Sequence, residues 1–343
     1  MSGGPPRGPR QGGERLTSPR TAEERAVATV AIALAAGVFG AVQPEVNTAL
    51  GSRVGSALLA SMANFAVALA VVLVAVSSRP TTRRTLVGLR SWDVPWWTLT
   101  AGIGGATVVV AGAVTVDTIG VAIFSVAFFA GQITFGLAVD RLGVAPGGTR
   151  PVTRARVYAV GLAVAAVVLA QVGRPVGELA PGLVAFAAVA GGAVALQSAF
   201  NGRIASATGD AISATVVNVV VGTVAVGSVV SVLALAGQIP APDWPSEPWL
   251  YSGGALGATI VLSLAVATAA LGVLRATLTM LAAQLLAAFV IDWAARGEAP
   301  TPGVVAGGLL VVGAVALVGR RAPPPQPPRA SFSTARRPGT TEQ

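Results

Sequence analysis

Ten apolar runs, each about 20 residues long, occupy most of this 343-residue chain. A helix of about 20 residues is long enough to cross the hydrocarbon core of a bilayer. At lipid depth every backbone polar group needs an internal partner, and runs this long without alternation are typical of helices, not of barrel strands. The sequence therefore predicts an all-α integral membrane protein with ten transmembrane helices. The runs lie at 26–48, 57–77, 96–116, 119–140, 155–172, 181–201, 211–236, 249–270, 272–294 and 302–319.

The segments outside these runs have a different composition. Residues 1–25 are rich in Gly, Pro, Ser and Arg, and residues 320–343 are rich in Pro and Arg. Such segments cannot bury enough apolar surface to fold, so we expect two disordered tails. The first apolar run follows several arginines and could be a signal peptide. Its counterpart in the repeat described below lies in mid-chain, however, so we interpret it as a true span.

Missing residue types exclude several functions. The chain has no cysteine, no histidine and no lysine, so all 23 basic residues are arginines. A Cys/His zinc site, a Ser-His-Asp triad, a Schiff-base lysine and a phosphate-binding loop ending in Gly-Lys-Ser/Thr are therefore excluded. We expect no enzyme, no metal site and no cofactor.

The arginines predict an orientation. They lie at the ends of the apolar runs and form no basic stripe with aromatic residues between, so the net charge of +9 does not indicate nucleic-acid binding. With ten spans, the face that carries both termini collects 20 of the 23 arginines, and only Arg53, Arg174 and Arg296 fall opposite. Positive charge stays cytoplasmic, so we expect both termini inside. The Arg-, Ala-, Val- and Gly-rich composition is typical of a GC-rich bacterial genome. We expect a multi-pass protein of the bacterial cytoplasmic membrane.

The two halves of the chain repeat each other. We divide them into a first unit, 26–172, and a second unit, 173–319. Each unit holds five spans, an odd number, so the second enters the membrane from the opposite face and the repeat is inverted. Inverted repeats are a recurrent architecture of secondary transporters. At an offset of 154 the aligned pairs are Gln43 and Gln197, Asn47 and Asn201, Ser52 and Ser206, Gly55 and Gly209, and Asn64 and Asn218; at an offset of 152 they are Thr107 and Thr259, Gly120 and Gly272, Gln132 and Gln284, and Asp140 and Asp292.

Three motifs carry a resemblance to a known family. They are Gly-x-x-Gln-x-x-x-Asn followed by a Gly-Ser/Asp-Ala turn, a Pro-Trp-Trp start of the third span, and Gly-Gln followed by Asp at the end of the fourth. Over residues 26–320 the sequence resembles two fused units of the YdcZ-like family, a branch of the drug/metabolite transporter superfamily related to EamA-type permeases. The resemblance implies a ten-helix transporter fold and favours export, but it implies no substrate. The two units differ at some aligned positions: Pro44 and Glu45 are aligned with Ser198 and Ala199, and Gly131 is aligned with Ala283.

Two glutamines are candidates for contact with a substrate. Gln132 and Gln284 each lie near the middle of a span of about 22 residues, which at about 1.5 Å per residue places them near the membrane midplane. Inversion relates them by a pseudo-two-fold axis, so they could bind a polar solute from both halves. The alternative is that each amide links two helices.

A second set of amides is expected in the first two spans of each unit. Gln43 and Asn47 are four residues apart and share a helical face, as do Gln197 and Asn201. Asn64 and Asn218 lie in the following spans. Inversion sends the two clusters toward opposite faces, which suits an outer and an inner gate better than one shared site. A structural hydrogen bond between the first two spans of each unit is the alternative. We also expect Pro44 to bend the first helix.

Few charges fall inside the apolar runs, where charge is costly. Glu45 and Asp117 are the candidates for proton coupling, since the chain has no histidine. For Glu45 the alternative is that its side chain reaches the interface. Arg275 replaces Ile123 of the first unit and could attract an anionic substrate or reach cytoplasmic water. We expect Asp140 and Asp292 to be interfacial, each beside its own arginine.

These observations favour a secondary transporter that moves a small molecule through the lipid bilayer by alternating access. The alternative from another class is a membrane-embedded interaction or regulatory subunit without transport activity. The oligomeric state stays open, with a homodimer as one possibility.

Overall fold

The computed structural model describes residues 22–170, 180–239, 241–296 and 302–319, and within these ranges it contains helices and no β-strand. The all-helical class predicted from the sequence is therefore confirmed. The longer helices are α1 (Ala22–Val54), α2 (Ala57–Ser77), α4 (Gly102–Leu142), α5 (Arg154–Ala170), α6 (Pro181–Thr208), α7 (Ala211–Leu235), α8 (Ser252–Leu271), α9 (Val273–Arg296) and α10 (Pro302–Gly319). The short ones are α3 (Pro80–Val87), η1 (Leu89–Ser91), η2 (Trp96–Thr100) and η3 (Pro248–Tyr251).

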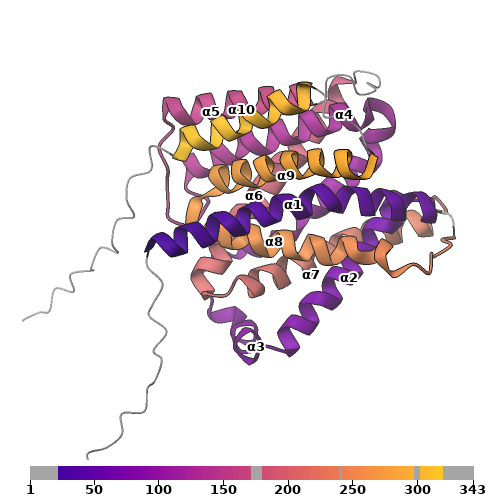
Figure 1. Ribbon diagram of the computed structural model, residues 1–343. Helices are drawn as coiled ribbons and strands as arrows, with labels where there is room; N and C mark the ends of the chain where they lie inside the picture. The colour runs from indigo at the N-terminus through magenta and orange to yellow at the C-terminus, as the bar shows by residue number, and fades with distance from the viewer. Residues whose placement is uncertain (1–21, 171–179, 240, 297–301, 320–343) are drawn as a thin grey trace, which may run out of the picture.

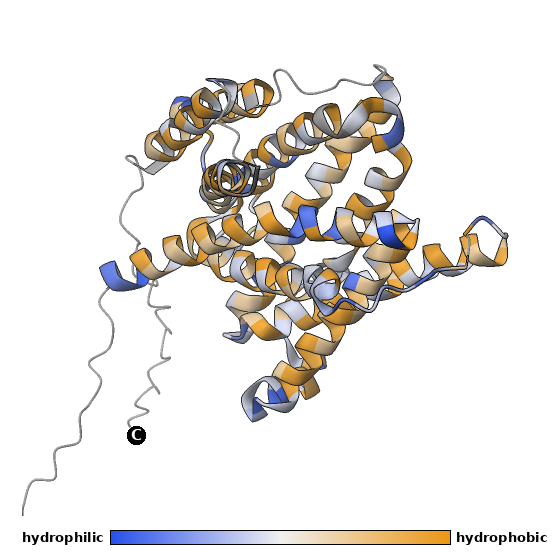
Figure 2. Ribbon diagram, turned by 45° about the vertical axis from the view of Figure 1, so that its right-hand side comes forward, coloured by the Kyte–Doolittle hydropathy of each residue, from blue (hydrophilic) through white to orange (hydrophobic). Residues whose placement is uncertain are grey.

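Apolar residues cover the outside of these helices. In the described chain, seven helical segments are long and apolar enough to cross a membrane by length and composition, and shorter apolar helices lie at Val273–Ala288 and Val305–Leu317. Leu73, Val224 and Leu309 are among many large apolar side chains that point outward. Figure 2 shows orange along most of each long helix and strong blue mainly at helix ends and turns, as at the start of α1. A lipid environment accounts for such an exterior, because soluble proteins rarely expose continuous apolar surface.

The helix boundaries differ from the apolar runs at several places, among them α1 and α6. The predicted span 57–77 coincides with α2, but α1 extends from Ala22 to Val54 and α6 continues to Thr208. Residues 22–25 are therefore helical, and the prediction that the N-terminal tail reaches residue 25 is wrong. Hydropathy falls at the ends of α1 and α6, yet polar residues continue a helix as readily as apolar ones do. The rest of both predicted tails lies outside the described residues.

A glycine followed by a capping residue joins the first two long helices of each half. Gly55 has φ +74°, and Gly209 has φ +66°, a backbone region that side chains other than glycine rarely enter. The next residue caps the following helix in both places. Ser56 Oγ accepts a hydrogen bond from the backbone N–H of Leu59, at 3.3 Å, and Asp210 Oδ1 accepts one from that of Ile212, at 3.0 Å. The sequence repeat is thus matched by a repeated turn.

A second pair of glycines breaks the next two helices in each half. Gly120, inside α4, has φ +76° and ψ +156°, so α4 consists of two helical parts that meet at this residue. Gly272, between α8 and α9, has φ +84° and ψ +166°. The two residues are aligned in the sequence repeat, and the part of α4 before Gly120 corresponds to α8.

The packing of the helices also repeats between the halves. Helix α1 packs against α8 and α9, and α6 packs against both parts of α4. Helices α2 and α7 contact each other, as do α5 and α10, which lie side by side at the top of Figure 1. Helix α1 begins and α10 ends on the same side of this bundle (Figure 1).

Small residues allow the close helix crossings. A Cβ atom added to Gly102 would overlap the carbonyl oxygen of Asn218, and one added to Gly254 would overlap that of Asn64. These contacts correspond in the repeat, and they bring backbones together as is common between membrane helices. The two glycines belong to the Gly-rich stretches 102–105 and 253–257, so close packing explains those stretches.

Candidate functional site

A cavity of about 270 Å³ lies where the two halves meet. It is bounded by α1, α2 and α8 together with α4, α6 and α7, so both units contribute to its wall. Aromatic and aliphatic side chains, among them Phe65, Phe128 and Ile260, form most of this wall. The polar side chains in it are those of Gln43, Asn47, Ser61, Asn64, Gln197 and Asn218.

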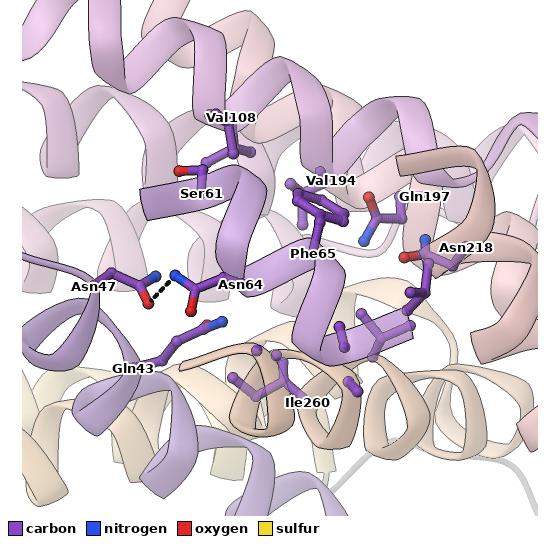
Figure 3. A pocket seen from close by; sticks show the side chains of 18 of the residues that line it. Gln43, Asn47, Ser61, Asn64, Phe65, Val108, Val194, Gln197, Asn218 and Ile260 are labelled. Carbon is purple, nitrogen blue, oxygen red and sulfur yellow. Dashed lines mark hydrogen bonds between the residues drawn. The ribbon is translucent and has the colours of Figure 1, made fainter. Parts of the chain in front are cut away.

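The amides of the first unit are held by hydrogen bonds. Asn64 Nδ2 donates to Asn47 Oδ1 at 2.7 Å, linking α2 to α1 (Figure 3). Gln43 Nε2 donates to the carbonyl oxygen of Gly253 at 3.0 Å, linking α1 to α8. A Cβ atom on Gly253 would overlap Asn47 Oδ1, so glycine is required there for the two asparagines to meet. The predicted structural bond between the first two spans is present in this unit.

Other amide atoms of the cavity are buried without a partner. Asn64 Oδ1, Gln197 Oε1 and Asn218 Nδ2 have no hydrogen-bond partner among the described residues. Asn64 and Asn218 are only 7% and 3% exposed. Figure 3 shows Gln197 and Asn218 on the side of Phe65 away from Asn47 and Gln43. A buried polar group without a partner costs free energy, so these atoms make the cavity a candidate site for a polar ligand.

Residues of both amide clusters line one cavity, which favours a shared site over separate gates at Gln43 and Gln197. The prediction took α1 and α6 to end near 48 and 201, whereas they continue to Val54 and Thr208. The glutamines therefore lie well inside their helices, close to the contact between the halves. Asn201 is the exception: it is 2% exposed and does not line the cavity.

The two candidate midplane glutamines lie outside the cavity lining. Gln132 is buried in α4, beside the crossing with α6. Gln284 Nε2 donates to the carbonyl oxygen of Gly40, at 3.2 Å. In a regular helix that carbonyl would accept from residue 44, but Pro44 has no N–H. Gln284 thus supplies the donor that the proline removes, and α1 continues through Pro44 as a helix.

The candidate charged residues are also outside the lining. Glu45 and Asp117 have exposed side chains, on α1 and on α4 just before its break at Gly120. Arg275 lies at the start of α9, close enough to Arg150 and Arg156 for the like charges to repel each other. The side chain of Asp292 lies outside the described part of the structure.

Sequence reasoning missed a buried ionic cluster at the end of α4. Asp140 is 0% exposed and pairs with Arg156 of α5, whereas the sequence placed it beside the neighbouring arginine. Asp140 also accepts hydrogen bonds from the backbone N–H groups of Val273 and Leu274, at 3.0 and 3.4 Å. These groups begin α9, where a helix dipole favours negative charge. The position of Asp140 at a repeated offset was the available signal.

Arg203 forms a second missed contact. Its Nε and Nη2 atoms donate to the carbonyl oxygens of Val144 and Gly143, at 2.6 and 2.8 Å. Its guanidinium lies 5.5 Å from the ring centroid of Trp97, and that ring contacts Phe200 with centroids 4.9 Å apart. Arg203 therefore ties α6 to the turn that follows α4.

A known family matches both halves of this chain. The family described as "Putative inner membrane exporter, YdcZ" matches residues 28–169 and matches again at residues 182–317. The chain belongs to the YdcZ family. The double match confirms the tandem pair of units recognised in the sequence, and it supports a multi-pass inner membrane protein of a transporter family.

Other comparisons inform only the fold of this YdcZ-family chain. A search of the curated proteins finds no match. A solved structure titled "Crystal structure of protein" is similar, with 19% sequence identity and a TM-score of 0.59. The alignment covers 85% of this chain and 95% of the other. The helical arrangement is thus shared with a structure of distant sequence.

Proposed function

We propose that this YdcZ-family chain is a secondary transporter that exports a small molecule by alternating access, using ten helices arranged as two inverted units of five. The observation that carries the proposal is the cavity at the contact between the halves. Each half contributes amides to it, and three buried amide atoms there have no partner among the described residues. A central site between two related halves is what alternating access requires.

The lining of the cavity supports one open side. Asn47 and Ser61 of the first unit line it, whereas their counterparts in the second unit, Asn201 and Thr215, do not and are 2% and 3% exposed. The cavity thus extends toward the α1–α2 turn and not toward the α6–α7 turn. Exchange of conformations between inverted units would open the other side.

Contacts at the α6–α7 side support a closed end there. Arg203 ties α6 to the turn after α4, and Asp140 ties the end of α4 to the start of α9. Both contacts must change if that side opens.

The orientation follows from the arginines. Helix α1 begins and α10 ends on one side of the bundle (Figure 1), and the arginines favour the cytoplasm for that side, so the open side of the cavity would be periplasmic. A reporter fused after Arg320 is expected to lie in the cytoplasm, so it should show cytoplasmic and not periplasmic activity. Periplasmic activity would reverse the orientation.

Flux measurements test the transport activity. Purified protein reconstituted in liposomes is expected to move at least one member of a broad solute panel. Asn64→Leu and Asn218→Leu should each reduce that flux at least about tenfold, because each removes a buried amide from the site. Ser228→Ala, at an exposed serine of α7, is the matched control and should keep the flux. Monodisperse elution of each variant shows that it has folded.

The rival function is that of a membrane-embedded subunit. Absence of flux for the whole panel, together with stoichiometric copurification of another membrane protein, would favour it over transport.

A further inference from the structure

The cavity wall is neutral. Among the described residues that line it there is no Asp, Glu or Arg. We propose that the substrate is an uncharged molecule that combines an apolar part with hydrogen-bond donors and an acceptor. This inference rests on the proposed function, because it takes the cavity as the substrate site.

A charged substrate would lack a partner in this cavity. An isolated charge that leaves water for apolar surroundings is strongly disfavoured unless an opposite charge meets it. The nearby ionic groups are arranged elsewhere: Asp140 pairs with Arg156, and Glu45 and Asp117 have exposed side chains outside the lining. No described charge is therefore placed to neutralise an anion or a cation in the site.

The unpartnered amide atoms define the hydrogen bonds that a substrate would make. Asn64 Nδ2 is engaged with Asn47, which leaves Asn64 Oδ1 as an acceptor, and Gln197 Oε1 is a second acceptor. Asn218 Nδ2 is a donor. A primary amide, or a part of a molecule with two hydroxyls, offers the two donors and the acceptor that would meet them.

The rest of the wall selects an apolar part. Phe65, Phe128 and the aliphatic residues around them offer no hydrogen bond. A cavity of about 270 Å³ is close to the lower limit for small-molecule sites, so it suits a compact ring or chain. Benzamide, benzoate and benzylamine have nearly the same shape. Benzamide is uncharged, benzoate is negative and benzylamine is positive, so a comparison of their binding shows the effect of charge.

Equilibrium binding of the three probes to the full-length purified protein tests the inference without a transport assay. Benzamide is expected to bind at least about tenfold more tightly than benzoate or benzylamine. Asn64→Leu should abolish the binding of benzamide. The inference is overturned if a charged probe binds as tightly as benzamide, or if no binding depends on this amide.

A charge placed in the cavity gives a second test. Asn218→Asp, which changes shape very little, should reverse the preference from benzamide to benzylamine, and Gln197→Glu should do the same from the other helix. Gln238→Glu, which adds a charge at an exposed residue outside the lining, is the control and should leave the preference unchanged. An unchanged preference in both folded cavity variants contradicts the inference.

The two proposals fail in different ways. Flux of a charged solute through the amide site refutes the neutral substrate while transport stands. Preferential binding of benzamide without flux of any solute refutes transport while the neutral site stands.

Discussion

Pro44 and Gln284 form a compensated pair in adjacent helices. Proline at position 44 leaves the carbonyl oxygen of Gly40 without its helical donor, and the side chain of Gln284 donates to that oxygen instead. The aligned position in the second unit is Ser198, which keeps its N–H, so its helix needs no such donor. The resemblance between Gln132 and Gln284 in sequence therefore hides a difference in role.

Gln284→Ala should lower the free energy of unfolding by about 1 kcal/mol, because the Gly40 carbonyl loses its donor. In a Pro44→Ala background the restored backbone N–H meets that carbonyl, and the same change should cost much less. Reversible unfolding in mixed micelles measures both values. Equal losses in the two backgrounds would show that Gln284 does not compensate for the proline.

The amide residues show how far sequence reasoning reaches at this scale. A spacing of four residues predicted that Gln43 and Asn47 share a helical face, and both side chains line the cavity. The spacing could not predict that Gln197 joins them, because that depends on how α6 packs against the other half. It also could not reveal the glycine at 253 that gives Asn47 and Asn64 room to bond.

At the scale of elements, Asp140 joins three helices. It belongs to α4, pairs with Arg156 of α5 and caps the start of α9. A buried ion pair contributes little net stability compared with apolar residues, but removal of one partner leaves a buried charge alone. This cluster is therefore more important for the arrangement of the helices than for their formation.

Arg156→Met should destabilise the protein by about 3 kcal/mol, because Asp140 stays buried without its partner. Asp140→Asn combined with Arg156→Met should cost less than Arg156→Met alone, since no buried charge remains. Thermal unfolding of the purified variants measures the order. The exposed pair of Arg53 and Glu247, 3.1 Å apart, is the control, and Arg53→Ala should cost less than about 1 kcal/mol. A larger loss in the double variant would contradict this account.

The elements themselves were largely predictable. Hydropathy located α2 and α10 to the residue, because their apolar runs end where the helices end. It failed for α1, whose end at Val54 is set by a left-handed glycine and not by polarity. It could not predict the partner of Asp140, because Arg156 is 16 residues away in sequence but adjacent in space.

At the scale of the whole molecule, the absence of cysteine provides a test of which side is open. In Ser61→Cys and Thr215→Cys, each new thiol is the only one in the protein. A membrane-impermeant thiol reagent should label Ser61→Cys from the periplasmic side and leave Thr215→Cys unlabelled. Quantitative labelling of intact cells measures both rates. In inside-out vesicles, a transported solute should increase the labelling of Thr215→Cys from the cytoplasmic side.

Equal labelling of the two positions from one side would contradict the single open side. If Thr215→Cys is labelled from the cytoplasmic side and Ser61→Cys is not labelled from the periplasmic side, the periplasmic side is closed in the resting protein.

If the two units were identical and oppositely oriented, the inward-open and outward-open states would have equal free energies. Neither state would then be preferred in the absence of a gradient. This chain escapes that degeneracy because its units are covalently joined and can diverge. Arg203, which ties α6 to the turn after α4, has Ala49 as its counterpart, and Pro44 has Ser198. A difference of about 1.4 kcal/mol between the ends shifts the populations tenfold. Because the fused units can differ in sequence, substitutions in one unit can make one of the two states lower in free energy, and that state would then be the resting state.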